Sequence, residues 1–458
     1  MTTYHPLYTA RCAQWRRYRL AYEGGADYIA CALRRHAKER EESFRTRLER
    51  AIYPNHIRSI VDTYAAHLYR EPIARESTNT LLQEAWADTD LMGTPASEFY
   101  ERVAQLVQVG GRAAIVVDRH DAGEARTRAQ ERALGRRPYV YAVGADELVD
   151  WSVDRRGRLQ WAVIAEHTPA PRTPLGKAQE QVARWRVWWP DRWQLLESRT
   201  VDGAPTGEPA VVEEGEHPVG EVPVTPIFWG VRRSAELLAD SAIKDLEPMG
   251  RRLTRLVSLI DEQVYQHVFS IMAVPQTTWE ALEQVQFSVS GAIPYPDDCS
   301  EPPHYIAPDV AQIAAIRSEI ETTEAKIRQL SGLGRVNAEG GHAKSGIALS
   351  YLTMDKDALL AKFGQRMSRA EASVDRHILG WMEQQGEATR SYPTHFDPLD
   401  LSNDLDAALK LVSIGITGDA LLEVQRAALR AYLGSRVKPA ELERTLSGLT
   451  TQLDQMLT

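Results

Sequence analysis

Cysteine is scarce in this 458-residue chain, and its three cysteines, Cys12, Cys31 and Cys299, lie far apart. No pair has the close spacing that holds a zinc ion or builds a disulfide framework, so we expect a reducing compartment. Long apolar runs are also missing: no stretch approaches the roughly 18 apolar residues of a membrane span, and the amino terminus lacks the apolar core of a secretion signal. The sequence therefore predicts a soluble protein with no membrane partner.

An excess of positive charge is lacking as well. The chain has 54 lysines and arginines against 63 aspartates and glutamates, a formal net charge of −9. This balance argues against a protein that holds DNA by bulk neutralisation of phosphates, although it allows looser contact. Residues 1–50 are an exception, with 11 basic and 6 acidic side chains, and we interpret this local excess as a solvated helix face.

Catalytic signatures are absent or incomplete. Residues 340–345 come closest to a phosphate-binding loop, but Ala343 stands where a glycine should precede the lysine, and a helical pattern lies upstream. No serine lies in a Gly-x-Ser-x-Gly elbow, and Asp297 and Asp298 have the composition of a turn. The histidines show no metal-binding spacing, and four of them stand alone: His304, His342, His377 and His395. We expect no enzyme activity, no metal and no cofactor.

The apolar residues, 43% of the chain, suffice for two or three packed domains. Residues 6–69 have a mostly helical pattern, a second helix is predicted over 94–109, and a short apolar strand over 112–118. The helical spacing is clearest in one set of residues: Ile57, Ile60, Val61, Tyr64 and Leu68.

Strand patterns follow. Residues 138–143, 159–165, 183–189 and 192–196 are rich in aromatic and β-branched residues, which favours an antiparallel meander. Four tryptophans of this block are interleaved with arginines: Trp185, Trp188, Trp189 and Trp193. These tryptophans could stack on the bases of a nucleic acid, but we favour the interpretation that they pack in the sheet. An acidic loop is predicted around Glu213, Glu214, Glu216 and Glu221, and the prolines of residues 222–229 indicate an edge segment.

The second half is again helical. An apolar stripe runs from Leu246 to Val264, six prolines interrupt residues 273–308, and a second helix is predicted from Asp309 onward. The glycine-rich residues 331–346 break that pattern, a long helix follows over about 347–385, and a last helical region covers 404–457. The fold class is therefore α+β, mostly helical.

Several local sequences, taken in order, resemble the portal protein of tailed bacteriophages, a head-to-tail connector. The similar segments are residues 53–64 (YPNHIRSIVDTY), 109–118 (VGGRAAIVVD), 147–151 (ELVDW) followed by 159–166, 220–226 (GEVPVTP) and 345–349 (SGIAL). Together they span about four fifths of the chain.

The resemblance implies a portal-type subunit. Its domains would be a wing of helices and antiparallel strands (1–235), stem helix 1 (236–272), a small clip (273–308), stem helix 2 (309–332), a tunnel loop (333–346), a long wing helix (347–401) and a helical crown (402–458).

The resemblance also implies an assembly. It is a homo-oligomeric ring, expected to be a dodecamer, at one capsid vertex of a virion, and it would be assembled in the host cytoplasm. Double-stranded DNA would pass through it during packaging and ejection. Its other implied partners are large terminase, major capsid and scaffolding proteins, and a head-tail adaptor.

The resemblance also implies where DNA would pass. The loop side chains facing DNA would be Arg335, Asn337, His342 and Lys344. The glycines that permit wide backbone excursions in that loop are Gly332, Gly334, Gly340, Gly341 and Gly346. The acids expected to line the stem channel are Asp261, Glu262, Glu319, Glu321 and Glu324. Neither predicted stem helix is net basic, so a channel lined by them would let DNA slide instead of binding it tightly. An ordinary solvated helix face would explain the same charges.

Two alternatives remain. One is a DNA-dependent NTPase or nuclease subunit that uses the 332–346 loop. The other is a structural capsid or adaptor protein without a DNA channel.

Overall fold

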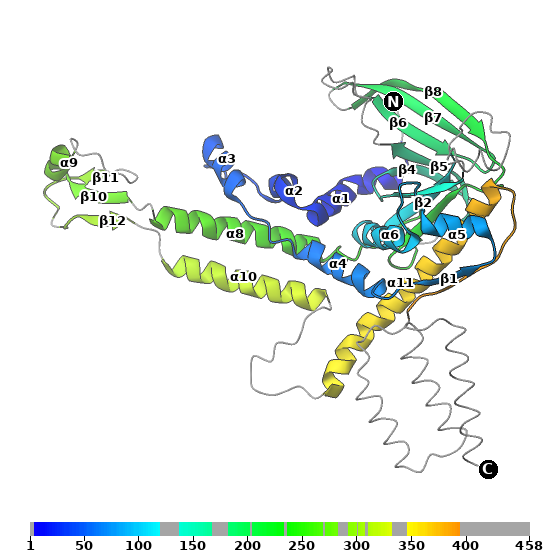
Figure 1. Cartoon of the computed structure of the whole chain (residues 1–458). Helices are drawn as coiled ribbons and strands as arrows, with labels where there is room; N and C mark the ends of the chain where they lie inside the picture. Colours follow the sequence, from blue (N-terminus) through cyan, green and yellow to red (C-terminus); the bar gives the residue numbers. More distant parts are fainter. Residues whose placement is uncertain are drawn as a thin grey trace, which may run out of the picture.

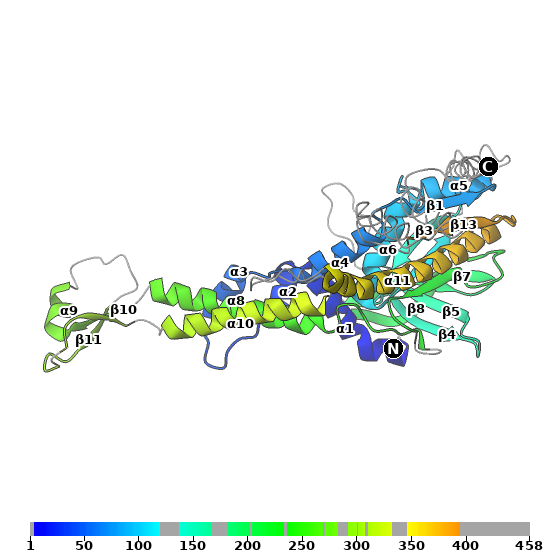
Figure 2. The same cartoon turned by 90° about the horizontal axis from the view of Figure 1, so that it is seen from below.

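The computed structural model describes residues 4–119, 137–166, 182–201, 204–232, 236–268, 271–282, 292–299, 301–306, 310–331 and 346–393. These residues form a body and a long projecting arm (Figures 1 and 2). The arm comprises the described residues between 246 and 331, and the body comprises the others. The helices are α1 (Pro6–Glu23), α2 (Gly25–Ala32), α3 (Glu41–Arg50), α4 (His56–Leu68), α5 (Thr80–Ala87), α6 (Ala96–Gly110), α8 (Leu246–Val268), α9 (Gln276–Leu282), α10 (Val310–Leu330) and α11 (Gly346–Trp381). The strands are β1 (Ala74–Ser77), β2 (Arg112–Asp118), β3 (Tyr139–Val143), β4 (Leu148–Val153), β5 (Leu159–Glu166), β6 (Val182–Trp188), β7 (Arg192–Val201), β8 (Ala204–Glu216), β9 (Val224–Phe228), β10 (Ile271–Pro275), β11 (Ala292–Tyr295), β12 (His304–Ile306) and β13 (Ala388–Ser391).

A three-stranded antiparallel sheet in the order β3-β2-β9 lies at the centre of the body. Every residue of β2 is buried, because α6 and α11 both pack against this strand. Gly111 makes the sharp turn from α6 into β2 with a φ of 75°, and a Cβ there would lie 2.6 Å from the carbonyl oxygen of Ala239. Only glycine accepts this backbone conformation and this close approach without strain.

Five consecutive strands, β4 to β8, form an antiparallel meander beside the central sheet. The predicted meander is thus confirmed, except that β3 joins the central sheet instead. The predicted acidic loop is wrong for Glu213, Glu214 and Glu216, which lie in the edge strand β8, where pairing with β7 outweighs their loop-like composition. The predicted edge position of residues 222–229 is confirmed by β9.

The long helix α11 crosses the body and buries one stripe of side chains. The buried residues recur every three or four positions, as the helical period requires: Leu360, Phe363, Met367, Ala370, Val374 and Ile378. Its last turns lead through Trp381 to β13, which pairs antiparallel with β1 from the first part of the chain. This pairing joins residues 74–77 to residues 388–391, so α11 is held at its end as well as along its side.

A buried cation joins several segments of the body, including the one that precedes α8. The Arg112 guanidinium lies 4.3 Å from the Trp15 ring and 4.4 Å from the Trp151 ring, and it donates to the carbonyl oxygens of Ala145, Leu148 and Leu237. Burial lowers the pKa of Arg112 to about 9. The two aromatic faces and the three carbonyls take the place of a carboxylate as partners of this charge.

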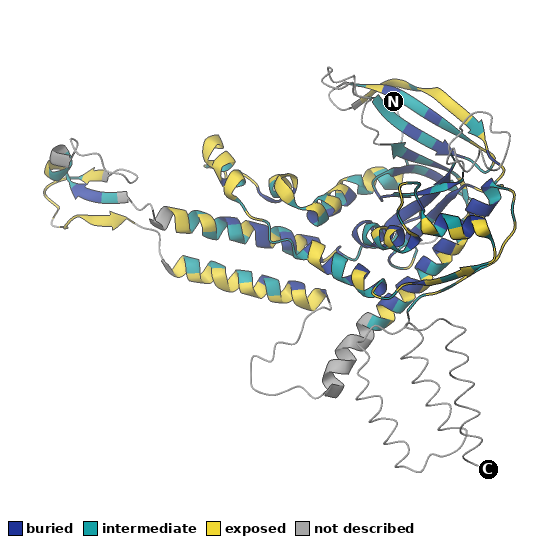
Figure 3. Cartoon of the chain, in the orientation of Figure 1, coloured by how far each residue is buried: buried dark blue, intermediate teal, exposed yellow. Residues whose placement is uncertain are grey.

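The arm consists of the antiparallel helices α8 and α10, with a small sheet at its far end (Figures 1 and 2). α8 packs against α10 and also against α2, α3 and α4, whereas α10 packs mainly on α8. At the tip, β10 pairs in parallel with β11 and antiparallel with β12. Figure 3 shows that exposed residues dominate α10 and β12, whereas α8 is mostly buried or intermediate.

The coarse predictions from the sequence are confirmed within the described residues. The fold is a mixture of helices and mostly antiparallel sheets, and Pro248 lies in the first turn of α8, as predicted. Trp185 and Trp188 are buried in the meander, as the sheet-packing interpretation predicts. The portal domain boundaries stay predictions, and the predicted helical tail after residue 404, the crown and His395 lie outside the described residues.

Candidate functional site

The predicted channel acids lie on both helices of the arm, and three of them have basic partners in the same chain. Glu319 accepts a hydrogen bond from Arg252 at 2.6 Å and so joins α10 to α8. Glu262 lies 3.4 Å from Arg50, at the end of α3. The sequence did not indicate these pairings, because each partner lies on a different helix.

Glu324 is the third paired acid, with His56 of α4 at 3.7 Å and Arg328 of α10 at 3.7 Å. Asp261 and Glu321 are exposed and form no ion pair with a described residue. Burial raises the pKa of Asp261, and the nearby Arg50 opposes this shift. The arm thus brings the five predicted acids onto one pair of helices, with two of them free to meet another molecule.

The predicted DNA-facing side chains Arg335, Asn337, His342 and Lys344 lie outside the described residues, as do Gly332, Gly334, Gly340 and Gly341. The described chain reaches Ser331 before this loop and resumes at Gly346, the first residue of α11. The Tyr64 hydroxyl donates a 2.6 Å hydrogen bond to the Ser331 carbonyl oxygen. The chain is therefore tied to α4 at the point where the predicted tunnel loop begins.

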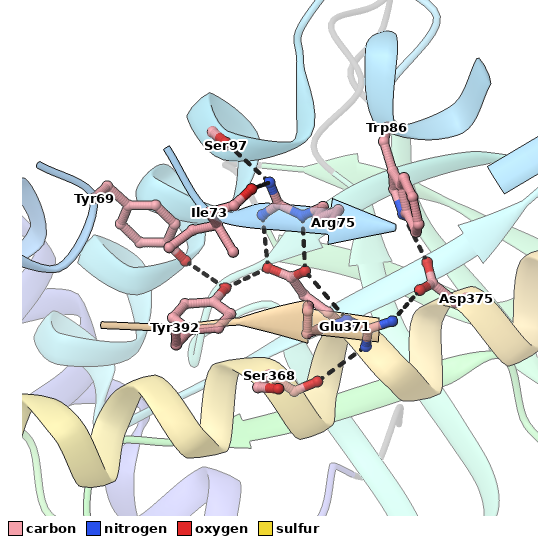
Figure 4. A network of polar contacts seen from close by, with 10 residues as sticks. Tyr69, Ile73, Arg75, Trp86, Ser97, Ser368, Glu371, Asp375 and Tyr392 are labelled. Atoms are coloured by element: carbon pink, nitrogen blue, oxygen red, sulfur yellow. Dashed lines mark hydrogen bonds and ion pairs between the residues drawn. The ribbon is translucent and has the colours of Figure 1, made fainter. Parts of the chain in front are cut away.

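A buried polar network joins α11 to β1 and β13 (Figure 4). Arg75 of β1 donates two hydrogen bonds to the Glu371 carboxylate, at 2.9 and 3.0 Å, and a third to Ser97. Tyr392 also donates to Glu371, and Tyr69 lies within hydrogen-bonding distance of Tyr392 at 3.1 Å. This two-point contact between a guanidinium and a carboxylate is strong and fixes the orientation of both groups.

The same network contains a second acid, one helical turn further along α11. Asp375 accepts hydrogen bonds from Arg390 of β13 and from the Trp86 indole, the latter at 3.1 Å. Burial raises the pKa of Asp375 to about 6, although Arg390 and Trp86 act in the opposite direction. The side chains of Glu371, Asp375 and Arg390 are 2%, 6% and 4% exposed. Because these groups are buried and already paired, they are suited to anchoring strands rather than to contacting a substrate.

Two of the isolated histidines and one aspartate of the pair have contacts in the described part of the chain. His377 is buried on α11, with Glu221 at 3.1 Å, and His304 is exposed beside the Pro302 carbonyl oxygen. Asp297 lies in a turn, as predicted, and accepts hydrogen bonds from the backbone amide and hydroxyl of Thr277 in the first turn of α9. Asp297 and His377 thus already have partners within the chain.

The described residues contain neither a metal-binding cluster nor a membrane-spanning helix. No group of three or more histidine, cysteine, aspartate or glutamate side chains in that part of the chain is arranged to hold a metal ion. None of its helices is both long enough and apolar enough to cross a membrane.

Comparison with known proteins gives a weak structural likeness. No protein-family model and no curated protein matches the chain. Among solved structures, the chain is similar to one from the neck of an empty GTA (gene transfer agent) particle computed with C6 symmetry, with 12% identity, a TM-score of 0.37 and coverage of 85% of this chain and 89% of that chain. It is also similar to a chain from the neck of a native GTA particle computed with C12 symmetry, with 11% identity, a TM-score of 0.36 and coverage of 86% and 90%. Because both scores are low, we base the functional proposal on this chain's own residues.

Proposed function

We propose that this protein is a portal-type subunit that forms a ring at a capsid vertex and gives double-stranded DNA a path through its centre. The ring would also provide the docking platform for terminase and for the head-tail adaptor. In this proposal the arm is the stem, its tip is the clip, and Arg335 and Lys344 of the 333–346 loop face DNA.

The observation that supports this proposal most is the incomplete burial of the arm. α10 packs mainly on α8. Its residues Ile313, Ile316, Ile320 and Ile327 are at least partly buried, whereas most other described positions of the helix are exposed. α8 is covered on its other side by α2, α3 and α4, whereas α10 has α8 as its main neighbour and leaves a large surface uncovered. Domains ordinarily cover such a surface with another layer. Neighbouring copies in a ring would supply that layer.

The charges of the arm fit passage of DNA. Each of the two helices carries three acidic residues and three lysines or arginines. Every phosphate that a protein neutralises adds affinity, and this affinity would multiply around a ring until the DNA could no longer slide. A wall of balanced charge avoids this outcome.

We also propose that the chain is not an enzyme. The buried carboxylates of the body are occupied by arginine, tyrosine and tryptophan partners. The sequence of the 332–346 loop departs from a phosphate-binding loop at Ala343.

Light scattering on the purified full-length chain at micromolar concentration, followed by negative-stain microscopy, tests the proposal. We expect a large homo-oligomer whose end-on views are rings with a central hole. Monomer or dimer alone, across a range of salt and magnesium concentrations, would refute the ring. Particles without a bore would favour the adaptor alternative. Heat on titration with ATP would favour the NTPase alternative, since a portal-type subunit should give none.

A further inference from the structure

The body has an acidic hollow between α1, α6 and the turn that joins β3 to β4. Its volume is about 690 Å³. Six acids line it: Glu23, Asp90, Glu98, Glu101, Asp146 and Glu147. Only two bases do so, Arg19 and Arg102, and Arg19 is already engaged with Asp146 at 3.0 Å and Glu23 at 3.7 Å. The hollow therefore keeps an excess of negative charge.

Four of these acids have no ion pair with a described residue. Asp90 and Glu147 accept hydrogen bonds from backbone amides, which leaves Glu98 and Glu101. Glu98 is exposed and Glu101 is half-buried, and both project from α6. Burial, together with the nearby carboxylates of Asp62 and Glu98, raises the pKa of Glu101. A cation brought into the hollow would relieve this repulsion. Met92 also lines the hollow and is 86% exposed, so an arriving surface would meet an apolar contact as well.

A matching basic corner lies on the same chain, in the connection between α2 and α3. Arg34, Lys38 and Arg40 are exposed there and form no ion pair with a described residue. The other charges of this connection are already paired, because Glu39 binds Arg47 at 2.7 Å and Arg35 binds Glu41 at 2.9 Å. Three cations are thus available for a partner.

We propose that the acidic hollow of one copy receives the basic corner, Arg34, Lys38 and Arg40, of a second copy of this chain. The occupant is assigned by charge complementarity between two surfaces that every copy carries. Because the surfaces are different, the contact is head-to-tail, and repeated head-to-tail contacts close into a ring when the rotation permits. The inference rests on the ring proposed above and names surfaces that would join its neighbours.

Charge reversal tests the contact. One variant carries Arg34→Glu, Lys38→Glu and Arg40→Glu, and another carries Glu98→Arg and Glu101→Arg. We expect each to raise the protein concentration needed for half-assembly at least about tenfold, because like charges would face each other. A variant with all five changes should recover assembly at least in part, because the two arginines introduced into the hollow can pair with the three glutamates introduced at the corner. Sedimentation velocity at low and high salt measures the assembled fraction, and circular dichroism checks that each variant is folded.

The control changes two equally exposed arginines of the β4–β5 turn, Arg155→Glu and Arg156→Glu, and should assemble like the wild type. If the wild type forms rings and either reversal leaves them unchanged, this contact is refuted while the ring stands. Failure of the five-change variant to recover assembly also refutes the contact. If the wild type forms no large oligomer, the ring and the contact are both refuted.

Discussion

The body contains a buried network of ion pairs, whereas the ion pair that joins the two helices of the arm is exposed to water. In the Arg75–Glu371 pair of the body the two side chains are 7% and 2% exposed, and in the Arg252–Glu319 pair of the arm they are 55% and 51% exposed. Figure 3 shows the same contrast for whole helices, with the mostly buried α6 on one side and the mostly exposed α10 on the other. The shape of the body is therefore set by contacts within one chain, while the arm keeps its surfaces available for other molecules.

The largest expected effect follows from breaking the buried network of the body. Glu371→Ala would leave Arg75 buried without its two-point partner and would remove the acceptor of Tyr392. Removing one partner of a buried ion pair costs about 3–5 kcal/mol of the free energy of unfolding. Urea denaturation of the purified variants measures this loss.

The matched control is Glu321→Ala on the exposed face of α10, which should change the free energy of unfolding by less than about 0.5 kcal/mol. Equal effects of the two substitutions would mean that the body and the arm do not differ in the way their charges are held.

A smaller effect concerns the pH dependence of the same network. Because burial raises the pKa of Asp375 to about 6 from an ordinary value of 3.8, the folded chain binds this proton more tightly than the unfolded chain does. Stability contributed by Asp375 therefore rises as the pH falls through 6 and is lost as the pH rises. Between pH 7 and pH 5 the gain is about 1.4 kcal/mol.

The comparison of wild type with Asp375→Asn isolates this contribution. The variant should lack the gain, so the difference between the two free energies of unfolding should change by about 1.4 kcal/mol between pH 7 and pH 5. A constant difference across this range would show that Asp375 titrates normally and that its burial is not the dominant influence.

Much of this architecture was predictable from the spacing of apolar residues along the sequence. The spacing of apolar residues placed α4, α6, α8, α10 and α11, because each helix buries one stripe against a neighbour. The buried strand β2 was visible as an apolar run over residues 113–117, one residue after two glycines. These signals are local, and a single sequence contains them in full.

The contacts that hold the body together were not predictable in this way. Arg75 and Glu371 are 296 residues apart, and nothing near either residue indicates the other. Arg112 was expected only as the first residue of a strand, since its tryptophan partners come from α1 and β4. The acids of α8 and α10 were recognised as a charged face, but the helical period does not reveal that Glu262 meets α3 or that Glu324 meets α4.

The smallest expected effect concerns the exposed ion pair of the arm, which we compare with the buried ion pairs of the body. Arg252 and Glu319 are joined at 2.6 Å, yet both side chains are more than half exposed, so water competes for each charge and salt screens their attraction. A double-mutant cycle with Arg252→Ala and Glu319→Ala should therefore give a coupling energy below about 1 kcal/mol, which decreases further as salt is added. Urea denaturation at a protein concentration below that of assembly measures the coupling in the isolated subunit. A coupling near that of the buried body network, insensitive to salt, would show that the arm is held by its own charges and has no need of neighbours to order it.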